Sequence, residues 1–446
     1  MVRPPAIRSC GSPPTARSSR VRGCVTCVVV FTSERFSCRL GLSGHGGCIT
    51  TWAVAGVTRV HVRPSCTPRV PPPSSEALVV PDQRTGRATR CFVTDTWLVT
   101  GGAGFIGRVV VEQLLAWTEG PQVVVLDAMT YAAHPVALRA VGESYAGLPE
   151  SSRLTIVEGD VADGVLVSKL MARVRPRVVL NLAAETHVDR SLSNNAPFVR
   201  TNVEGTEMLV RASVDCRVER FVQVSTDEVY GDRVGRRAAR ETDGVEPTNP
   251  YAATKACGDA LVQAAVRSSG LDAVITRGCN TYGPGQFPEK LLPLAALRWG
   301  ADQPMWVYGD GLQERVWLHV DDHAAGILAA ARVGTEGAVY HFSGGRPRTN
   351  QATLESWRRA LGLGGRPDDY LRRVADRPGH DRRYALGDQE TRRQLGWAPR
   401  RSWRSGLRAT AKWLASNPQF WASSLEQHGV SAFFAAQYGE PPVVAS

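Results

Sequence analysis

A tyrosine and a lysine four positions apart, Tyr251 and Lys255, are residues whose types and spacing can do chemistry. They follow Asn249-Pro250, which predicts that they lie in the first turns of a helix. Residues four apart share a helix face, so the lysine ammonium lies near the tyrosine ring. A positive charge lowers the pKa of a phenol from about 10 toward neutrality. The pair therefore predicts a tyrosine that acts as a base.

A second polar group, Thr226, Asp227 and Glu228, follows the apolar run at residues 221–225. This run predicts a buried strand that delivers the three side chains to its carboxyl end. Adjacent carboxylates repel each other, so the pKa of at least one should rise, which suits an acid and a base working together. The alternative interpretation is a solvated turn or a helix cap.

Three glycines, Gly101, Gly104 and Gly107, separate an apolar run at residues 97–100 from an amphipathic stretch at 109–117. Strand, tight turn and helix in this order suit a dinucleotide pyrophosphate, which binds at the helix N-terminus. A second apolar run ends in Asp127, twenty residues after Gly107. A carboxylate there binds ribose hydroxyls and repels a 2′-phosphate, so the predicted cofactor is NAD rather than NADP.

A third segment, residues 182–191, follows another apolar run. Its small residues allow the backbone to pass close to a cofactor, and its polar residues can line a sugar pocket. His187 and Asp189 are possible metal ligands, but no further His or Cys follows at ligand spacing. We therefore expect no metal site.

Short apolar runs alternate with helix-like segments from residue 96 onward. The runs at 154–158, 178–182, 221–225 and 273–276 predict buried strands, and the segments 163–174, 196–216 and 250–269 predict helices. This alternation predicts an α/β fold with a doubly wound parallel sheet, a Rossmann-like NAD-binding domain, over residues 96–280. After residue 280 the sequence contains more Pro, Gly, Trp and Arg, and its expected elements are shorter. This change predicts a smaller C-terminal substrate-binding lobe at 281–425, partly interleaved with the first domain, and a tail at 426–446.

The first 95 residues differ from the rest in charge. They contain 13 Arg, no Lys and 4 acidic residues, whereas the other 351 residues carry 40 basic and 38 acidic side chains. The net charge of +11 therefore belongs mainly to this leader, and the nearly neutral body argues against a nucleic-acid binder. The body has three Cys, which is consistent with a cytoplasmic protein.

The leader itself has no signal-peptide layout and no apolar run long enough to span a bilayer. Cys24 and Cys27 lack a second ligand pair at zinc-site spacing. We expect residues 1–95 to be a disordered extension or the result of a misassigned start, with an Arg-rich transit peptide as the alternative.

With these motifs together, residues 96–415 resemble the extended short-chain dehydrogenase/reductase family and, within it, the dTDP-glucose 4,6-dehydratases. The glycine turn and the Tyr251/Lys255 pair are shared by the whole superfamily. The Thr-Asp-Glu triplet and the segment Asp-Arg-Pro-Gly-His-Asp-Arg-Arg-Tyr at 376–384 are more specific to the dehydratases. The other motifs that carry the resemblance lie at 183–191, 201–203, 280–284, 286–293 and 308–313.

The resemblance implies an NAD-dependent hydro-lyase that converts dTDP-glucose to dTDP-4-keto-6-deoxyglucose. Tyr251, helped by Thr226, would remove the 4-hydroxyl proton while the C4 hydride passes to NAD. Glu228 would remove the C5 proton and Asp227 would protonate the C6 hydroxyl, so that water leaves before the hydride returns to C6. Lys255 would act beside Tyr251, and both would meet the nicotinamide ribose.

The same resemblance implies two sets of binding residues. The set for NAD is Gly101, Gly104, Phe105, Ile106, Gly107, Asp127, Thr130, Asp160, Val161, Leu182, Ala183, Ala184, Thr201, Tyr251, Lys255 and Thr281. The set for the nucleotide sugar is Thr186, Thr226, Asn280, Lys290, Leu291, Trp306, Tyr308, Arg315, Asn350, Arg377 and His380. Arg and Lys suit a diphosphate, and aromatic rings suit a pyrimidine face.

Five positions depart from the family pattern. Arg108 replaces a small residue beside the glycine turn, His134 replaces an Asn, and Thr281 replaces a second Asn near the nicotinamide. Val316 and Pro347 replace an Asp and a Glu near the nucleotide, and so bear on the preference for dTDP over UDP.

Other functions remain as alternatives. A related nucleotide-sugar 4-epimerase or a UDP-glucuronate decarboxylase is the nearest, although an epimerase has no use for an acid/base pair at C5 and C6. A regulator that senses NAD on the same fold is the non-enzyme alternative, although it would not need both Tyr251 and Lys255. The resemblance also implies a homodimer, formed through the segments 196–216 and 250–269.

A protein that begins near Asp95 should fold and bind NAD like the full chain, because the leader has too little patterned apolar surface to offset the entropy of ordering. Binding of NAD to both proteins, measured by calorimetry, checks this. A truncated protein that is insoluble or binds no cofactor, beside a sound full-length chain, would show that the leader is structural.

Overall fold

The computed structural model describes residues 95–145 and 153–418, residues 420 and 434–436, and the backbone of four short strands before residue 95. The chain divides into two compact units, residues 1–76 and 77–446. In the first, β1 (Thr50–Val54) pairs antiparallel with β2 (Val57–His61). In the second, β3 (Leu78–Pro81) pairs antiparallel with β4 (Ala88–Cys91). We expect the leader, residues 1–95, to be disordered. Most of these residues lie outside the described part of the chain, which includes only Asp95 and the backbone of these four strands.

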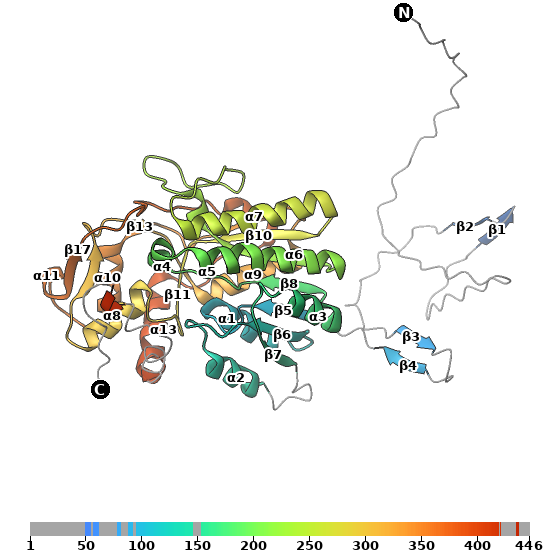
Figure 1. Ribbon diagram of the computed structural model, residues 1–446, viewed down its shortest axis with the longest axis horizontal. Coiled ribbons are helices and arrows are strands. Elements are labelled where there is room, and N and C mark those ends of the chain that lie inside the picture. The colour runs from blue at the N-terminus through green and yellow to red at the C-terminus, as the bar shows by residue number, and fades with distance from the viewer. Residues whose placement is uncertain are drawn as a thin grey trace, which may run out of the picture. The chain divides into compact units, whose positions relative to one another are not determined.

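Seven parallel strands form the central sheet of the second unit (Figure 1). They are β5 (Thr96–Thr100), β6 (Gln122–Asp127), β7 (Leu154–Glu158), β8 (Val178–Asn181), β9 (Arg220–Thr226), β10 (Ala273–Gly278) and β15 (Val339–Phe342). Their order is β15-β10-β9-β8-β5-β6-β7, so the winding reverses between β5 and β8. Ligands of such sheets bind beyond the carboxyl ends of the strands at this switch point. The predicted doubly wound parallel sheet is confirmed.

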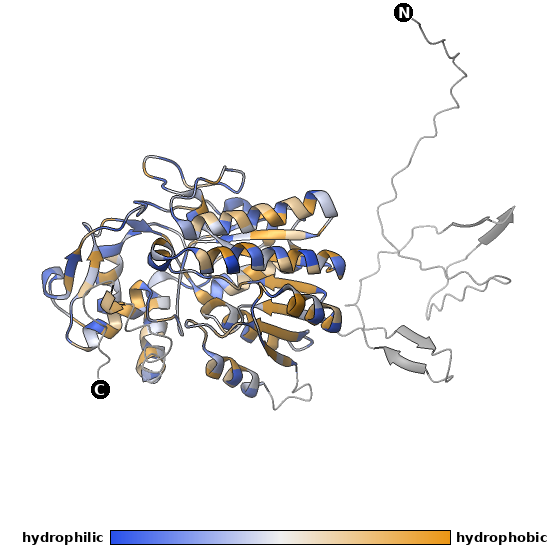
Figure 2. Cartoon of the chain, in the orientation of Figure 1, coloured by the Kyte–Doolittle hydropathy of each residue, from blue (hydrophilic) through white to orange (hydrophobic). Residues whose placement is uncertain are grey.

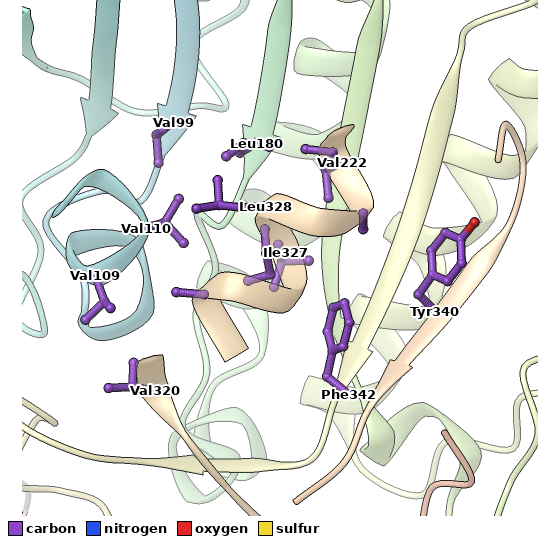
Figure 3. Close-up of a cluster of buried hydrophobic side chains, with 14 of the residues drawn as sticks. Val99, Val109, Val110, Leu180, Val222, Val320, Ile327, Leu328, Tyr340 and Phe342 are labelled. Carbon is purple, nitrogen blue, oxygen red and sulfur yellow. The ribbon is translucent and has the colours of Figure 1, made fainter. Parts of the chain in front are cut away.

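Helices cover both faces of the sheet. On one face α1 (Phe105–Leu115) packs beside α9 (Val320–Val333), and on the other α6 (Gly205–Asp215) packs between α3 (Gly164–Val174) and α7 (Pro250–Ser269). Successive strand residues point to opposite faces. Val99 and Leu180 therefore pack with α1 and α9 (Figure 3), and their neighbours Leu98 and Val179 belong to the core on the other face. Because both faces of the sheet are buried, these strands have unbroken apolar sequences. Figure 2 shows the sheet in the colour of hydrophobic residues.

The region after residue 280 builds a second, smaller core and also returns to the sheet. Around Trp306 and Trp357 pack α8 (Leu291–Gly300), β12 (Met305–Tyr308), α10 (Asn350–Ala360) and α13 (Trp403–Ser416). Strand β15 and helix α9 come from the same region but pack in the main core, because Tyr340, Phe342 and Ile327 are buried there. The sequence did not reveal β15.

The remaining elements are short. They are α2 (Pro135–Ser144), α4 (Val188–Ser193), α5 (Ala196–Phe198), the π-helical turn η1 (Val199–Glu204), the 3₁₀ turn η2 (Asp227–Tyr230), β11 (Asn280–Tyr282), β13 (Glu314–Arg315), β14 (Trp317–His319), β16 (Arg348–Thr349), α11 (Pro367–Tyr370), β17 (Leu371–Val374) and α12 (Gln389–Leu395). No helix in the described part of the chain is both long and apolar enough to cross a membrane.

The predicted helix at 196–216 is in fact α5, η1 and α6 in succession. The buried Asn202 lies in the π-helical turn, and its side chain bonds to the backbone N–H and C=O of Glu185 at 3.0 and 3.1 Å and to Thr254 at 2.9 Å. Such turns widen a helix locally and are frequent near functional sites. Here the turn ties the helix to the segment that follows β8.

Candidate active site

Three adjoining cavities lie at the carboxyl ends of the strands, and together they are lined by every residue assigned to a site from the sequence. The central cavity, of about 290 Å³, is lined by Gly101, Gly104, Phe105, Ile106, Gly107, Leu182, Ala184, Thr186, Thr226, Asp227, Glu228, Tyr251, Lys255, Asn280, Thr281 and Lys290 among others. A second cavity, of about 150 Å³, adds Asp127, Thr130, Asp160, Val161, Ala183 and Thr201. The third, of about 200 Å³, adds Leu291, Trp306, Tyr308, Arg315, Asn350, Arg377 and His380.

The glycine turn between β5 and α1 depends on the absence of side chains. Gly101 has a φ of +69°, and a Cβ there would lie 2.7 Å from the backbone nitrogen of Ala183, on the far side of the switch point. A Cβ on Gly107 would lie 2.1 Å from the carbonyl oxygen of Gly101. The absence of Cβ atoms at Gly101 and Gly107 lets the start of α1 lie close to the strand end. The free N–H groups of α1 are then directed toward the switch point.

Asp127 at the end of β6 braces this turn as well as lining the second cavity. Its carboxylate accepts hydrogen bonds from the backbone N–H of Ala103 and of Met129, each at 2.9 Å. Burial raises the pKa of Asp127, and the two hydrogen bonds oppose that rise. The residues present therefore fit an NAD molecule: bare backbone for the pyrophosphate, and a carboxylate in the adjoining cavity for ribose hydroxyls.

The acid/base pair expected after β9 is brought together in η2. Asp227 is buried, and its pKa is raised to about 8, first by burial and then by the charge of Glu228. Among the described residues none donates a hydrogen bond to its Oδ2 atom. Glu228 accepts hydrogen bonds from Asn249 Nδ2 and from the hydroxyl of Tyr384, both at 3.3 Å. Burial thus favours the protonated form of Asp227 near neutral pH, whereas Glu228 has two donors within 3.3 Å of one oxygen.

The expectation that Lys255 lowers the pKa of Tyr251 is wrong for this structure. Burial and then the charge of Glu228 raise the pKa of the phenol, opposed by a hydrogen bond with Thr226. The Lys255 ammonium donates instead to the carbonyl oxygen of Val224 at 2.6 Å, and burial lowers the pKa of this lysine to about 8. Helical spacing places the two residues on one face but does not direct the ammonium at the ring.

The third cavity has the charges that a diphosphate needs. The Arg377 guanidinium donates to Asp189 at 2.9 Å, and the Tyr308 hydroxyl donates to the other oxygen of Asp189 at 2.8 Å. Arg377 therefore holds the pKa of Asp189 below its usual range against the effect of burial. The guanidinium of Arg315 lies 4.1 Å from the centre of the Tyr384 ring. Asp189 thus orients Arg377 in this cavity.

Two residues at this site were not assigned a role from the sequence. Tyr384 lies between Glu228 and Asp381, and its single hydroxyl proton is shared between the two carboxylates, at 3.3 and 2.7 Å. Glu289 is buried between the central and third cavities, 3.2 Å from Lys290 and 3.8 Å from His187. Both belong to motifs on which the family resemblance depends, so those motifs were the available signal.

The departures from the family pattern have separate structural roles. Arg108 donates to the carbonyl oxygen of Pro284 at 3.1 Å, and so joins α1 to the loop opposite. His134 accepts from the N–H of Ala137 at the start of α2, and Thr281 bonds to His323 at 2.7 Å. Val316 is buried in the main core, so this substitution does not place its side chain at the third cavity.

Comparison with known proteins agrees with this geometry. Residues 97–342 match the NAD dependent epimerase/dehydratase family. The chain belongs to this family. It is 42% identical over 328 residues to a dTDP-glucose 4,6-dehydratase of Streptomyces niveus, covering 73% of this chain and 94% of that protein. It is also 42% identical to the low-salt glycan biosynthesis protein Agl12 of Haloferax volcanii, covering 70% and 96%.

Solved structures give the same result for the fold. DesIV, a dTDP-glucose 4,6-dehydratase from Streptomyces venezuelae crystallised with NAD and TYD bound, is 40% identical with a TM-score of 0.69, covering 74% of this chain and 99% of that one. A UDP-glucose 4-epimerase from Thermotoga maritima is 26% identical with a TM-score of 0.65, covering 72% and 99%. The family recognised from the motifs and its cofactor, NAD, are confirmed.

The raised pKa of Asp227 predicts a pH-dependent cost to stability. Between about pH 4 and about pH 8 an unfolded Asp is ionised while the folded Asp227 keeps its proton, so stability falls as pH rises, by at most about 1.4 kcal/mol per pH unit. Asp227→Asn is neutral in both states. The free energy of unfolding of this variant, relative to the wild type, should therefore rise steadily from about pH 5 to about pH 8.

Denaturant unfolding at several pH values measures this difference. Asp243→Asn is the matched control, because hydrogen bonding to Arg237 lowers the pKa of Asp243 to about 2, and that group does not titrate in this range. A flat difference for Asp227→Asn would show that Asp227 is ionised in the folded protein.

Proposed function

We propose that this protein is a nucleotide-sugar 4,6-dehydratase that converts dTDP-glucose to dTDP-4-keto-6-deoxyglucose. The observation that carries the proposal is the buried, protonated Asp227 beside Glu228, which accepts two hydrogen bonds, in the cavity that also holds Tyr251. Elimination of water needs an acid for the leaving hydroxyl and a base for the adjacent carbon. A 4-epimerase needs neither.

The first step requires a base at the 4-hydroxyl of the glucosyl unit. Tyr251, hydrogen-bonded to Thr226, takes that proton. NAD, held beside the glycine turn, would supply the acceptor for the C4 hydride and later its donor to C6, and its cationic ring would oppose the rise that burial causes in the pKa of Tyr251. Lys255, held by Val224 at the end of β9, supplies a donor for the ribose of the nicotinamide half.

The second step is elimination across C5 and C6. The 4-ketone makes the C5 proton acidic, and Glu228 removes it; Asn249 and Tyr384 stabilise the carboxylate that waits for this proton. Asp227 protonates the C6 hydroxyl, which leaves as water. When the hydride returns to C6, the proton held by Glu228 returns to C5. The two neighbouring carboxyl groups thus have different surroundings before the reaction starts, and burial raises the pKa of Asp227, which suits the acid of the pair.

The nucleotide half of the substrate occupies the third cavity in this proposal. Arg377 and Arg315 face the diphosphate, and Lys290 joins them from the loop before α8. Trp306 and Tyr308 from β12 offer aromatic surface for the pyrimidine. Turnover of dTDP-glucose, compared with UDP-glucose and followed by NMR of the sugar product, tests the substrate assignment. Inversion at C4 without loss of the C6 hydroxyl would favour the epimerase alternative instead.

Substitution of the two carboxylates separates the chemical steps. Asp227→Asn and Glu228→Gln keep the size of each side chain but remove its proton transfer, which lowers elimination by about 10² to 10⁴. Oxidation at C4 should be less affected, so reduced NAD accumulates on the enzyme with little 6-deoxy product. Stopped-flow absorbance of the reduced nicotinamide and NMR of the product measure the two steps.

Two further variants serve as controls. Tyr251→Phe should abolish both reduction of NAD and product formation while NAD stays bound. Glu390→Gln removes an exposed carboxylate paired with Arg393 on α12, and should change neither step. Wild-type turnover by both carboxylate variants would end the dehydratase assignment.

We further propose a cytoplasmic homodimer. Helices α6 and α7 pack side by side on one face of the sheet, and α7 exposes the small residues Cys257, Ala260 and Ala264 along its outer surface. Two such helix pairs form a four-helix contact when two copies meet. Light scattering at micromolar concentration should give a dimer, and Ala260→Arg should give a monomer because it places a charge in the contact. A monomeric wild type would contradict this.

A further inference from the structure

Four buried polar side chains outside the three cavities form a continuous hydrogen-bonded chain. Arg277 on β10 contacts Asp259 on α7 at 2.9 and 3.0 Å, and donates to the hydroxyl of Tyr230 at 2.6 Å. That hydroxyl lies 2.7 Å from Nε2 of His341 on β15. The four side chains are at most 6% exposed. The chain therefore connects α7, which carries Tyr251 and Lys255, with η2, which carries Asp227 and Glu228.

The hydrogen bonds that join Arg277, Tyr230 and His341 place each of their protons at one position. The carbonyl oxygen of Gly387, 2.9 Å from Nδ1 of His341, can only accept, so Nδ1 carries the proton and Nε2 is free to accept. Burial lowers the pKa of His341 to about 3, which keeps the ring neutral. Tyr230 then donates to His341 and accepts from Arg277. Hydrogen bonds with fixed donors and acceptors hold Arg277, Tyr230 and His341 in one arrangement.

Asp259 lies one helical turn after Lys255, on the same face of α7. Ser225 and Arg277 both donate to its Oδ2 atom, whereas Oδ1 accepts no hydrogen bond in the described part of the chain. Burial disfavours the charged form of Lys255, and Asp259 is the charge that opposes this effect. Burial raises the pKa of Asp259, and the charges of Arg277 and Lys255 oppose that rise, so the two cations favour its charged form.

Other charged residues occur on the elements packed against α7. They are Arg220 on β9, Arg277 on β10, Asp227 and Glu228 on η2, Asp189 and Arg190 on α4, Arg200 and Glu204 on η1, and Glu207, Arg211 and Asp215 on α6. None of these groups raises the pKa of Lys255 as Asp259 does. The charges of Glu228 and Asp227 instead raise the pKa of Tyr251.

We propose that Asp259 and Arg277 are positioning residues of the reaction: Asp259 is the buried counter-charge that keeps Lys255 an ammonium, and Arg277 fixes η2 through Tyr230. The second half of this inference rests on the proposed function, whereas the first half concerns the protein without substrate. Neither residue was singled out from the sequence, because each lies outside the motifs, and only the fold brings them together.

The charge state of Lys255 can be measured directly, because the full chain contains only four lysines, Lys169, Lys255, Lys290 and Lys412. Lysine labelled with carbon-13 at Cε gives four NMR signals, and the signal lost in Lys255→Met identifies the one to follow. In the wild type it should titrate near pH 8. In Asp259→Asn its pKa should fall by at least about one unit, a tenfold change in the protonation equilibrium.

Asp272→Asn is the matched control. It removes the partner of Arg220, 3.0 Å away, at the opposite ends of the same two strands, β9 and β10, and should leave the Lys255 signal unchanged. If Asp259→Asn does not fold, the double variant Asp259→Asn/Arg277→Met removes both buried charges together, which buried pairs tolerate better than loss of one partner. An unchanged Lys255 pKa in the folded variant overturns the counter-charge role, whatever the substrate is.

The link to η2 has its own readout. Tyr230→Phe keeps the ring but breaks the chain between Arg277 and His341, so elimination should slow at least about tenfold while reduction of NAD proceeds at the wild-type rate. Equal slowing of both steps, or of neither, overturns this half of the proposal. A wild-type protein that does not act on dTDP-glucose overturns the proposed function instead, and leaves the NMR result intact.

Discussion

The close contact between Gly107 and Gly101 is the constraint on which the rest of the site depends. A Cβ at position 107 would be 2.1 Å from a backbone oxygen, so α1 can start directly at the end of β5 only because no side chain intervenes. That contact brings the helix N-terminus to the point where the winding of the sheet reverses. The central cavity forms there, and the adjoining cavities extend from it toward β6 on one side and toward the smaller core on the other.

Burial of ionisable groups then decides what this place can do. Water is excluded from Asp227, so its neutral form is favoured and it becomes an acid near neutral pH. The same exclusion works against the charge on Lys255, which makes the nearby Asp259 important. Asp259 in turn needs Arg277, because a buried carboxylate without a partner is costly. The properties of the site and the hydrogen bonds from Asp259 to His341 therefore both follow from the cost of burying charged groups.

The fold alone does not separate the functions that this family contains. A UDP-glucose 4-epimerase shares it with a TM-score of 0.65, and a glycine turn that binds NAD does not by itself specify the reaction. In the proposed function, the difference lies in a few side chains at the end of β9. We propose opposite roles for Asp227 and Glu228 because the first is enclosed, whereas the second accepts hydrogen bonds from Asn249 and Tyr384.

Local patterns in the sequence were enough to predict most strands of the main sheet, the glycine turn and the residues that line the cavities, because each depends on the identities of neighbouring residues. Strand β15 was missed because its place is decided by burial of Tyr340 and Phe342 against distant elements. The direction of the Tyr251 pKa shift was also wrong, because helical spacing does not show that Lys255 points to Val224. Tyr384 reaches Glu228, and Arg277 reaches Asp259, across large separations in the chain. Residue types and spacing thus determined the chemistry available, whereas only tertiary packing decided which groups are buried, paired and protonated, since desolvation and charge act through space and not along the sequence.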